Sequence, residues 1–492
     1  MHRRRTWILR RVLISMWLAG FACLAWPVET KPLFTDAFPP EEFAARRTRL
    51  MAQIGDGVAV LQGATEYAAF VKFRQNNQVF YLTGLEVPRV IVVIDGRTKR
   101  ATAYLQERNE REMRSEGPVM TPGPEAVTLS GLDEVLPRDK FAAALQALAA
   151  DGRTLYLPRR AEALGATSPE YSRGHADKSM EDQWDGRLSR ELTFLQRVKA
   201  QAPKCAIKDL DPLLDQMRLT KSAREIAVVR EATRISALAI AESMRAVKPG
   251  MYEYELEAIG DYVFKKHNAQ GFAYFALVAA GTNAWWPHYH AAQSRLADGD
   301  LVLYDYAPDY KYYTSDVTRM FPANGKFSPR QREMYGIYLK FYQALMSSIR
   351  PNVPIPVLME DAVGKMEREL ASFTFADAKV KAAAEKFVDA YRRRGSRART
   401  LGHWVGMEVH DVGGDVQSYR PGMIFTIEPA LTLEDERVYV RLEDVILITE
   451  SGYENMSADL PVEIDAIEKL MTEPGLSDVA TGATASTRPS VR

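Results

Sequence analysis

Two pairs of acidic residues lie near the ends of apolar, strand-like segments. Asp305 follows the run Leu-Val-Leu-Tyr, and Asp316 comes eleven residues later. Glu428 follows Met-Ile-Phe-Thr-Ile, and Glu443 follows Val-Tyr-Val-Arg-Leu. A lone Asp or Glu is usually a solvated surface residue. Four acids in matched positions after apolar strands instead favour a shared site.

Hairpin geometry predicts that the two members of each pair face each other. A turn centred on Tyr310 and Lys311 places the two aspartates opposite each other, and a turn centred on Asp435 and Glu436 does the same for the two glutamates. Opposed residues have Cβ atoms about 5 Å apart, and like charges at that distance destabilise a sheet. Two divalent metal ions about 3.5 to 4 Å apart would satisfy all four carboxylates. Solvated acids in surface hairpins are the alternative.

Four of the seven histidines fall in two short segments, which favours a metal site or proton transfer. His288 and His290 belong to Trp-Pro-His-Tyr-His, and His403 and His410 begin and end His-Trp-Val-Gly-Met-Glu-Val-His. Only one of His288 and His290 needs to point inward, so the role of His290 stays open.

The elements that must position these side chains recur in one order over residues 219–470. Ser222 followed by Glu225 is a capping box, which predicts the start of a helix. The other predicted elements are a helix over 254–267, strands over 272–280 and 301–321, a helix after Ser328, a helical tract over 357–393 and strands over 423–447. Helices followed by strands, repeated once, suggest an internal duplication with a site in the cleft between the halves.

The preceding region, residues 38–204, is predicted to be a mixed α/β domain. Strands are predicted over 57–61, 79–82, 89–94 and 154–157, and helices over 41–54 and 140–150. This region contains no catalytic constellation.

Both ends of the chain differ in composition from the rest. Residues 1–26 have the pattern of a secretory signal peptide, because arginines precede an apolar run from Val12 to Trp26. That run is shorter than the roughly 20 residues of a membrane span, although a short membrane anchor is the alternative. We therefore expect a secreted or periplasmic protein without a stable membrane partner after signal removal. Residues 473–492 are rich in Ser, Thr, Ala, Gly and Pro, which predicts a disordered tail.

The 492 residues predict two or three domains of ordinary globular composition. Lys and Arg number 64, as do Asp and Glu, so no net charge points to nucleic acid as a partner. The two cysteines are Cys23, in the predicted signal, and Cys205, which excludes an internal disulfide framework.

Ordered motifs over roughly residues 40–470 resemble those of the metallopeptidases with the pita-bread fold, most closely aminopeptidase P and prolidase, which cleave bonds that precede proline. The motifs are Val79 to Gly84, Pro287-His288-Tyr289, Asp305 with Asp316, Gly402-His403-Trp404, Val409-His410-Asp411-Val412-Gly413, Arg420 to Met423, Thr426-Ile427-Glu428-Pro429 and Arg441-Leu442-Glu443-Asp444. The resemblance implies an α+β protein whose duplicated pita-bread catalytic domain follows a mixed α/β domain.

The resemblance also implies a dinuclear metal centre with five ligands. Asp305 would bind one metal, His403 and Glu428 the other, and Asp316 and Glu443 would bridge both. A metal-bridging hydroxide would be the nucleophile, since divalent ions lower the pKa of bound water. Carboxylate-rich ligation with one histidine favours manganese, with cobalt, zinc or iron as alternatives.

The remaining site residues take their roles from the same resemblance. His288 and His410 would contact the substrate and stabilise the oxyanion. Glu428 could pass a proton to the leaving nitrogen, and Arg441 would orient the bridging Glu443. Arg399 occupies a position where many family members have histidine, and its fixed charge could favour substrates with a free carboxylate near the scissile bond.

These observations predict a metal-dependent aminopeptidase that removes the residue before a proline at the second position of a peptide. Prolidase activity, limited to Xaa-Pro dipeptides, is the alternative within the family. A non-catalytic binding module and a metal-independent hydrolase of the creatinase type are disfavoured, because none of the five ligands is missing. Family members are often dimers or tetramers, so a homo-oligomer is possible.

Overall fold

A computed structural model of the chain describes residues 34–66, 71–107, 110–117, 119–163 and 165–476. The predicted signal peptide, residues 1–26, and the predicted tail from residue 477 onward lie outside the described residues. The first tail residues, 473–476, are packed: Glu473 pairs with Arg245 at 2.9 Å, and Leu476 contacts the core. In the described part of the chain, every helix is too short or too polar to cross a membrane.

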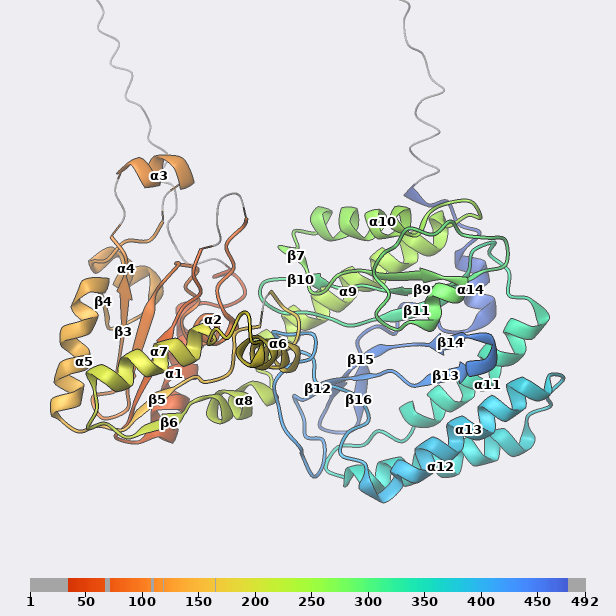
Figure 1. The fold of residues 1–492 in the computed structure, drawn as a ribbon. Helices are drawn as coiled ribbons and strands as arrows, with labels where there is room; N and C mark the ends of the chain where they lie inside the picture. Colours follow the sequence, from red (N-terminus) through yellow and green to blue (C-terminus); the bar gives the residue numbers. More distant parts are fainter. Residues whose placement is uncertain (1–33, 67–70, 108–109, 118, 164, 477–492) are drawn as a thin grey trace, which may run out of the picture.

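The N-terminal domain is built on one six-stranded sheet (Figure 1). Its strands are β1 (Val58–Gln62), β2 (Ile91–Asp95), β3 (Arg100–Leu105), β4 (Glu134–Pro137), β5 (Leu155–Leu157) and β6 (Ile207–Asp209), in the order β4-β3-β2-β1-β5-β6. Its helices are α1 (Pro40–Ile54), α2 (Asn77–Thr83), α3 (Glu110–Glu116), α4 (Pro124–Ser130), α5 (Phe141–Ala150), α6 (Pro169–Glu181) and α7 (Arg190–Gln201). The sheet extends to Asp209, five residues past the boundary predicted at residue 204.

Alternation along β1 explains why helices cover both faces of this sheet. Val58 and Val60 pack with side chains of α5 and α7, whereas Ala59 and Leu61 face the cluster formed with α1 and α2. All four side chains are buried. Successive side chains of a strand point to opposite faces, so a strand of consecutive apolar residues needs cover on both sides.

The predicted strand over 79–82 is wrong, because this segment belongs to helix α2. The side chain of Asn76 accepts a hydrogen bond from the Val79 amide at the start of the helix. Gly84 ends the helix in the left-handed conformation, with φ of 69°. These two caps outweigh the strand preference of the β-branched and aromatic residues between them.

The C-terminal domain places its strands between two groups of helices (Figure 1). After α8 (Asp211–Leu219), the first half contains α9 (Ala223–Ala246), α10 (Glu253–Lys266), β7 (Gly271–Phe272), β8 (Leu277–Ala280), β9 (Leu301–Asp305), β10 (Pro308–Asp309) and β11 (Thr318–Pro322). The second half contains α11 (Pro329–Met346), α12 (Ile355–Ser372), α13 (Ala378–Arg394), β12 (Ile424–Ile427), β13 (Ala430–Leu433), β14 (Val438–Arg441), β15 (Asp444–Ile448) and β16 (Tyr453–Asn455), before α14 (Ile464–Leu470). Helices followed by strands therefore occur twice, and α9 begins with the predicted capping box of Ser222 and Glu225.

A backbone bridge at one pair of residues joins the strands of the two halves. Strand order is β11-β9-β8 in the first half and β12-β15-β16 in the second. Thr318 and Glu443 form an antiparallel bridge between these sheets, with N···O distances of 3.3 and 3.1 Å. The predicted acids therefore lie along the seam between the halves.

Candidate active site

A cavity of about 370 Å³ brings together all the site residues predicted from the sequence. Its lining includes Asp305, Asp316, His403, Glu428, Glu443, His288, His410 and Arg441. His288 and His290 are both exposed, but only His288 lines the cavity; the Nδ1 of His290 lies 3.1 Å from the carbonyl oxygen of His288. Of the two neighbouring histidines, His288 is therefore the one at the site.

The first acidic pair converges on the cavity, but its predicted register is wrong. Asp305 ends β9 and lies opposite Thr318 of β11, rather than opposite Asp316. The chain between the strands is not a simple hairpin, because β10 leaves to pair with β7. Side chains alternate with a period of two, so a shift of two residues keeps Asp316 on the predicted face.

A tyrosine that the sequence analysis did not select joins this pair. The Tyr274 hydroxyl lies 2.5 Å from Asp305 Oδ1 and 2.8 Å from Asp316 Oδ1. It can donate its single proton to one carboxylate at a time. Tyr274 occupies an otherwise irregular segment between β7 and β8, so no spacing in the sequence indicated its role.

The second acidic pair has the predicted register. Ile427 pairs with Asp444 on one side of the acidic pair, and Ala430 pairs with Arg441 on the other side. Both pairings belong to the same hairpin register. This register places Glu428 opposite Glu443, between the β12·β15 and β13·β14 ladders. Thr318 Oγ1 donates a hydrogen bond of 2.8 Å to Glu443 Oε2, so the seam residue also orients this carboxylate.

His403 lies among the acids. Its Nε2 is 3.4 Å from Asp316 Oδ2, 3.3 Å from Glu428 Oε1 and 3.6 Å from Glu443 Oε1. Its Nδ1 is 3.1 Å from the carbonyl oxygen of Trp404. An N–H at Nδ1 donating to that carbonyl leaves the Nε2 lone pair facing the carboxylates, as a metal ligand requires.

Arg441 is the one permanently charged cation in the cavity lining. Its Nη2 contacts Asp305, and its Nη1 is 3.5 Å from Glu428 Oε2. Four carboxylates therefore face one guanidinium and one imidazole. Buried like charges are unfavourable unless cations or hydrogen bonds compensate them.

The donor set fits divalent metal ions. Ligand atoms of Asp305, Asp316 and Glu443 lie within 4.8 Å of one another, as do those of His403, Glu428 and Glu443. Among the described residues, Glu443 Oε1 is buried and has no hydrogen-bond partner. The two groups share Glu443, and together they offer four carboxylates and one imidazole. This donor set is suited to a pair of divalent cations.

The electrostatics of the protein alone show how strongly the acids affect one another. Burial raises the pKa of Asp305 to about 6, opposed by Arg441 and assisted by Glu443. Burial also raises the pKa of Asp316 to about 6, with Asp305 acting in the same direction. The pKa of Glu428 is raised by burial and by Glu443. The site thus favours binding of positive charge over retention of four bare carboxylates.

The two remaining histidines form the wall beside His403. The rings of His403 and His410 stack with centroids 3.9 Å apart and planes 7° apart. Burial, together with His403 and His288, lowers the pKa of His410 to about 3. Burial also lowers the pKa of His288. Both histidines line the cavity as neutral imidazoles that can donate or accept hydrogen bonds.

The N-terminal domain closes one side of the cavity through α6, which lies where the two lobes meet (Figure 1). The Tyr171 ring is 5.8 Å from the His410 ring and 6.4 Å from the His288 ring. The Val409 amide donates to the Ala166 carbonyl at 2.8 Å. This contribution depends on how the domains pack, and the sequence analysis did not predict it.

Arg399, expected to influence substrate choice, does not reach this cavity in the structure. Arg399 is exposed and is not among the residues that line the cavity.

Two family models match the chain. Residues 43–156 match the aminopeptidase P N-terminal domain, and residues 227–450 match metallopeptidase family M24. The predicted order of an α/β N-terminal domain followed by a metallopeptidase domain is therefore confirmed.

Individual relatives agree with the family models. The Xaa-Pro aminopeptidase of Escherichia coli is 36% identical over 287 residues, which cover 56% of this chain and 64% of that protein. The Xaa-Pro aminopeptidase of Haemophilus influenzae is 29% identical over 459 residues, which cover 88% of this chain and 97% of that protein. The solved structure of Pseudomonas aeruginosa aminopeptidase PepP is 30% identical with a TM-score of 0.69, covering 91% of this chain and 99% of that one.

Proposed function

Since the chain belongs to the aminopeptidase P group of metallopeptidase family M24 and is therefore a metallo-aminopeptidase, we propose that it removes the N-terminal residue from peptides whose second residue is proline. Two of its relatives are Xaa-Pro aminopeptidases. The observation that carries the proposal is the convergence of five candidate metal ligands in one cavity beside His288 and His410.

We propose a dinuclear centre held by Asp305, Asp316, His403, Glu428 and Glu443. Divalent cations bound there would activate water and polarise the scissile carbonyl. The donor set favours manganese over cobalt, zinc or iron. The duplicated order of helices and strands supports the expectation of a pita-bread catalytic domain.

Residues of the cavity also account for proton transfer, orientation of the substrate carbonyl and positioning of the acids. Glu428 is the most solvent-accessible of the four acids, with its side chain 28% exposed against 1% for Glu443. It is therefore the carboxylate placed to carry a proton to the leaving proline nitrogen. His288 and His410 face the cavity as uncharged donors and orient the carbonyl oxygen. Arg441 contacts Asp305 and lies 3.5 Å from Glu428 Oε2, so these two carboxylates are nearer to it than Glu443, its predicted partner, whose Oε2 is 4.0 Å away.

The test is release of the N-terminal residue from an Xaa-Pro-Xaa tripeptide and an Xaa-Pro dipeptide by Mn²⁺-loaded protein. We expect cleavage of the tripeptide, its loss in Glu428→Ala, and full activity in Glu434→Ala. Glu434 is a matched control because it lies at the turn of the hairpin that carries Glu428, where it is mostly exposed and paired with Lys386. Cleavage of the dipeptide alone would indicate prolidase, and no cleavage of either peptide despite bound metal would refute proline specificity.

Two further features of the proposal concern the whole protein. The arginine-led apolar segment at residues 1–26 supports export to the periplasm or the cell exterior, with a membrane anchor as the alternative. Size measurement of the purified protein tests whether it forms the homo-oligomer expected from family resemblance, and N-terminal sequencing of the exported protein tests the signal.

A further inference from the structure

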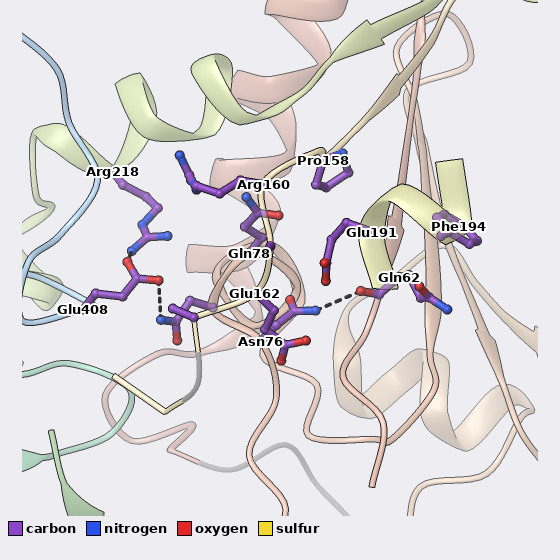
Figure 2. Close-up of a pocket in the computed structure, with 13 residues that line it drawn as sticks. Gln62, Asn76, Gln78, Pro158, Arg160, Glu162, Glu191, Phe194, Arg218 and Glu408 are labelled. Carbon is purple, nitrogen blue, oxygen red and sulfur yellow. Dashed lines mark hydrogen bonds and ion pairs between the residues drawn. The ribbon is translucent and has the colours of Figure 1, made fainter. Parts of the chain in front are cut away.

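Four buried charged side chains lie next to His410. We call them the charge cluster: Arg218, Lys221, Glu408 and Asp411. Arg218 Nη2 contacts both carboxylates, and Lys221 Nζ lies 3.1 Å from Asp411 Oδ2. Each of the four side chains is at most 5% exposed. Figure 2 shows Arg218 beside Glu408 at the edge of a polar pocket between the domains. Two cations thus balance two carboxylates away from solvent.

The charge cluster closes the loop that runs from His403 to His410. The Asp411 amide donates to the Trp404 carbonyl at 2.8 Å, which brings the two ends of the loop together. At Gly406 a Cβ atom would lie 2.0 Å from Asp411 Oδ2, so the carboxylate rests directly on the backbone of the loop. The position of this carboxylate, and with it the shape of the loop, depends on Arg218 and Lys221.

The cluster also connects the loop to the N-terminal domain. Asn77 Nδ2 donates to Glu408 Oε1 at 2.7 Å and to the Met407 carbonyl at 3.2 Å. Arg74 Nη1 donates to Asn77 Oδ1 at 2.8 Å, and Arg74 Nε donates to Asp309 Oδ2 at 2.6 Å. The loop is therefore held from α8, from α2 and, through Arg74, from the first half of the catalytic domain.

His410 lies between the two carboxylates that Arg218 binds, two residues after Glu408 and one before Asp411. Its ring stacks on that of His403 at 3.9 Å. Because ion pairs with Arg218 hold Glu408 on one side of His410 and Asp411 on the other, the backbone of His410 can rotate less than it could if only one of these neighbours were held. A lysine at position 218 would keep the charge but present one ammonium in place of the planar guanidinium.

We propose that Arg218 is a positioning residue for catalysis: by binding Glu408 and Asp411 together, it holds His410 against His403 in the geometry that the substrate carbonyl requires. The proposal rests on the proposed peptidase function for its kinetic part. Its structural part, the restriction of residues 403–411 by Arg218, stands without any activity.

The experiment compares Arg218→Lys with a matched control, Arg160→Lys. Arg160 lines the same pocket, and its guanidinium donates hydrogen bonds of 2.8 and 2.7 Å to Asp215 rather than to the 403–411 loop. Its charge acts on Glu408 only through space, and lysine keeps that charge. For each variant we measure hydrogen–deuterium exchange, and kcat and KM on an Xaa-Pro-Xaa tripeptide with Mn²⁺. His410→Ala is measured alone and combined with Arg218→Lys.

We expect Arg218→Lys to raise exchange in peptides that cover 403–411 and to lower kcat about tenfold or more, with KM within about twofold. We expect Arg160→Lys to match the wild type in both measurements. If Arg218 acts through His410, adding Arg218→Lys to His410→Ala slows the enzyme no further. If Arg218→Lys does not fold, Asp411→Asn, which keeps the shape of the side chain, replaces it in the same cycle.

The outcomes separate the two proposals. A wild-type protein that cleaves no peptide, together with raised exchange at 403–411 in Arg218→Lys, refutes the proposed function and supports the structural role of Arg218. An active wild type with unchanged exchange and kcat in Arg218→Lys overturns the inference. Additive losses in the double variant, or an equal loss in Arg160→Lys, overturn it as well.

Discussion

Replacing Tyr274 by phenylalanine should weaken metal binding without disturbing the fold. The hydroxyl is 2.5 Å from Asp305 Oδ1 and 2.8 Å from Asp316 Oδ1, and both carboxylates are buried. A hydrogen bond to a charged group contributes about 1.5–3 kcal/mol, and each 1.4 kcal/mol corresponds to a factor of about ten. Groups that orient metal ligands typically change affinity or activity about 10–100-fold. We therefore expect Tyr274→Phe to raise the dissociation constant for Mn²⁺ within this range.

The assay is isothermal titration of the metal-free protein with Mn²⁺, followed by kcat on an Xaa-Pro-Xaa tripeptide. Tyr306→Phe is the matched control, because the Tyr306 hydroxyl is also hydrogen-bonded, at 2.6 Å to Asp261 Oδ1, in the same domain. Its ring centroid lies 6.4 Å from that of Tyr274, but the residue does not line the cavity. Wild-type metal affinity in Tyr274→Phe, or an equal loss in Tyr306→Phe, would refute the argument that Tyr274 orients the aspartates.

Three further predictions concern stability and metal dependence. Arg319 and Asp444 form a fully buried ion pair at 2.7 Å; Arg319→Met should lower the free energy of unfolding by about 3–5 kcal/mol in urea titrations, and a loss below about 1 kcal/mol would contradict this. Gly406→Ala should lower both the melting temperature and kcat, because the new Cβ would lie 2.0 Å from Asp411 Oδ2, whereas Gly414→Ala, with nothing within 4 Å, should change neither. Chelation of divalent metals should abolish tripeptide cleavage and lower the melting temperature, and Mn²⁺ should restore both; activity that survives complete chelation would exclude a metal-dependent reaction.

The sequence correctly predicted the features that depend on a single hairpin or helix. The register of the second acidic pair followed from counting residues across the turn at Asp435 and Glu436, because the β12·β15 and β13·β14 ladders share one register. The α9 start followed from a capping box that acts within four residues. Such features depend on neighbours in the sequence, so their residue types are enough to predict them.

Prediction failed where tertiary contacts redirected the chain. The link between β9 and β11 includes Lys311 and Tyr312 at positive φ, and β10 pairs outside the hairpin, which shifts the first acidic pair by two residues. Tyr274 and Tyr171 carry no motif of their own and gain their roles only when distant segments pack together. The charge cluster around Arg218 joins residues about 190 positions apart in the sequence, which no local pattern reveals.

The backbone bridge between Thr318 and Glu443 has a mechanical consequence. Glu443 belongs to both ligand groups, and the same residue ties the first half of the domain to the second through its main chain. Hinge-like separation of the halves would break both backbone hydrogen bonds and pull this carboxylate out of the site. We therefore expect the two halves to stay together as one unit while a peptide enters and leaves the cavity.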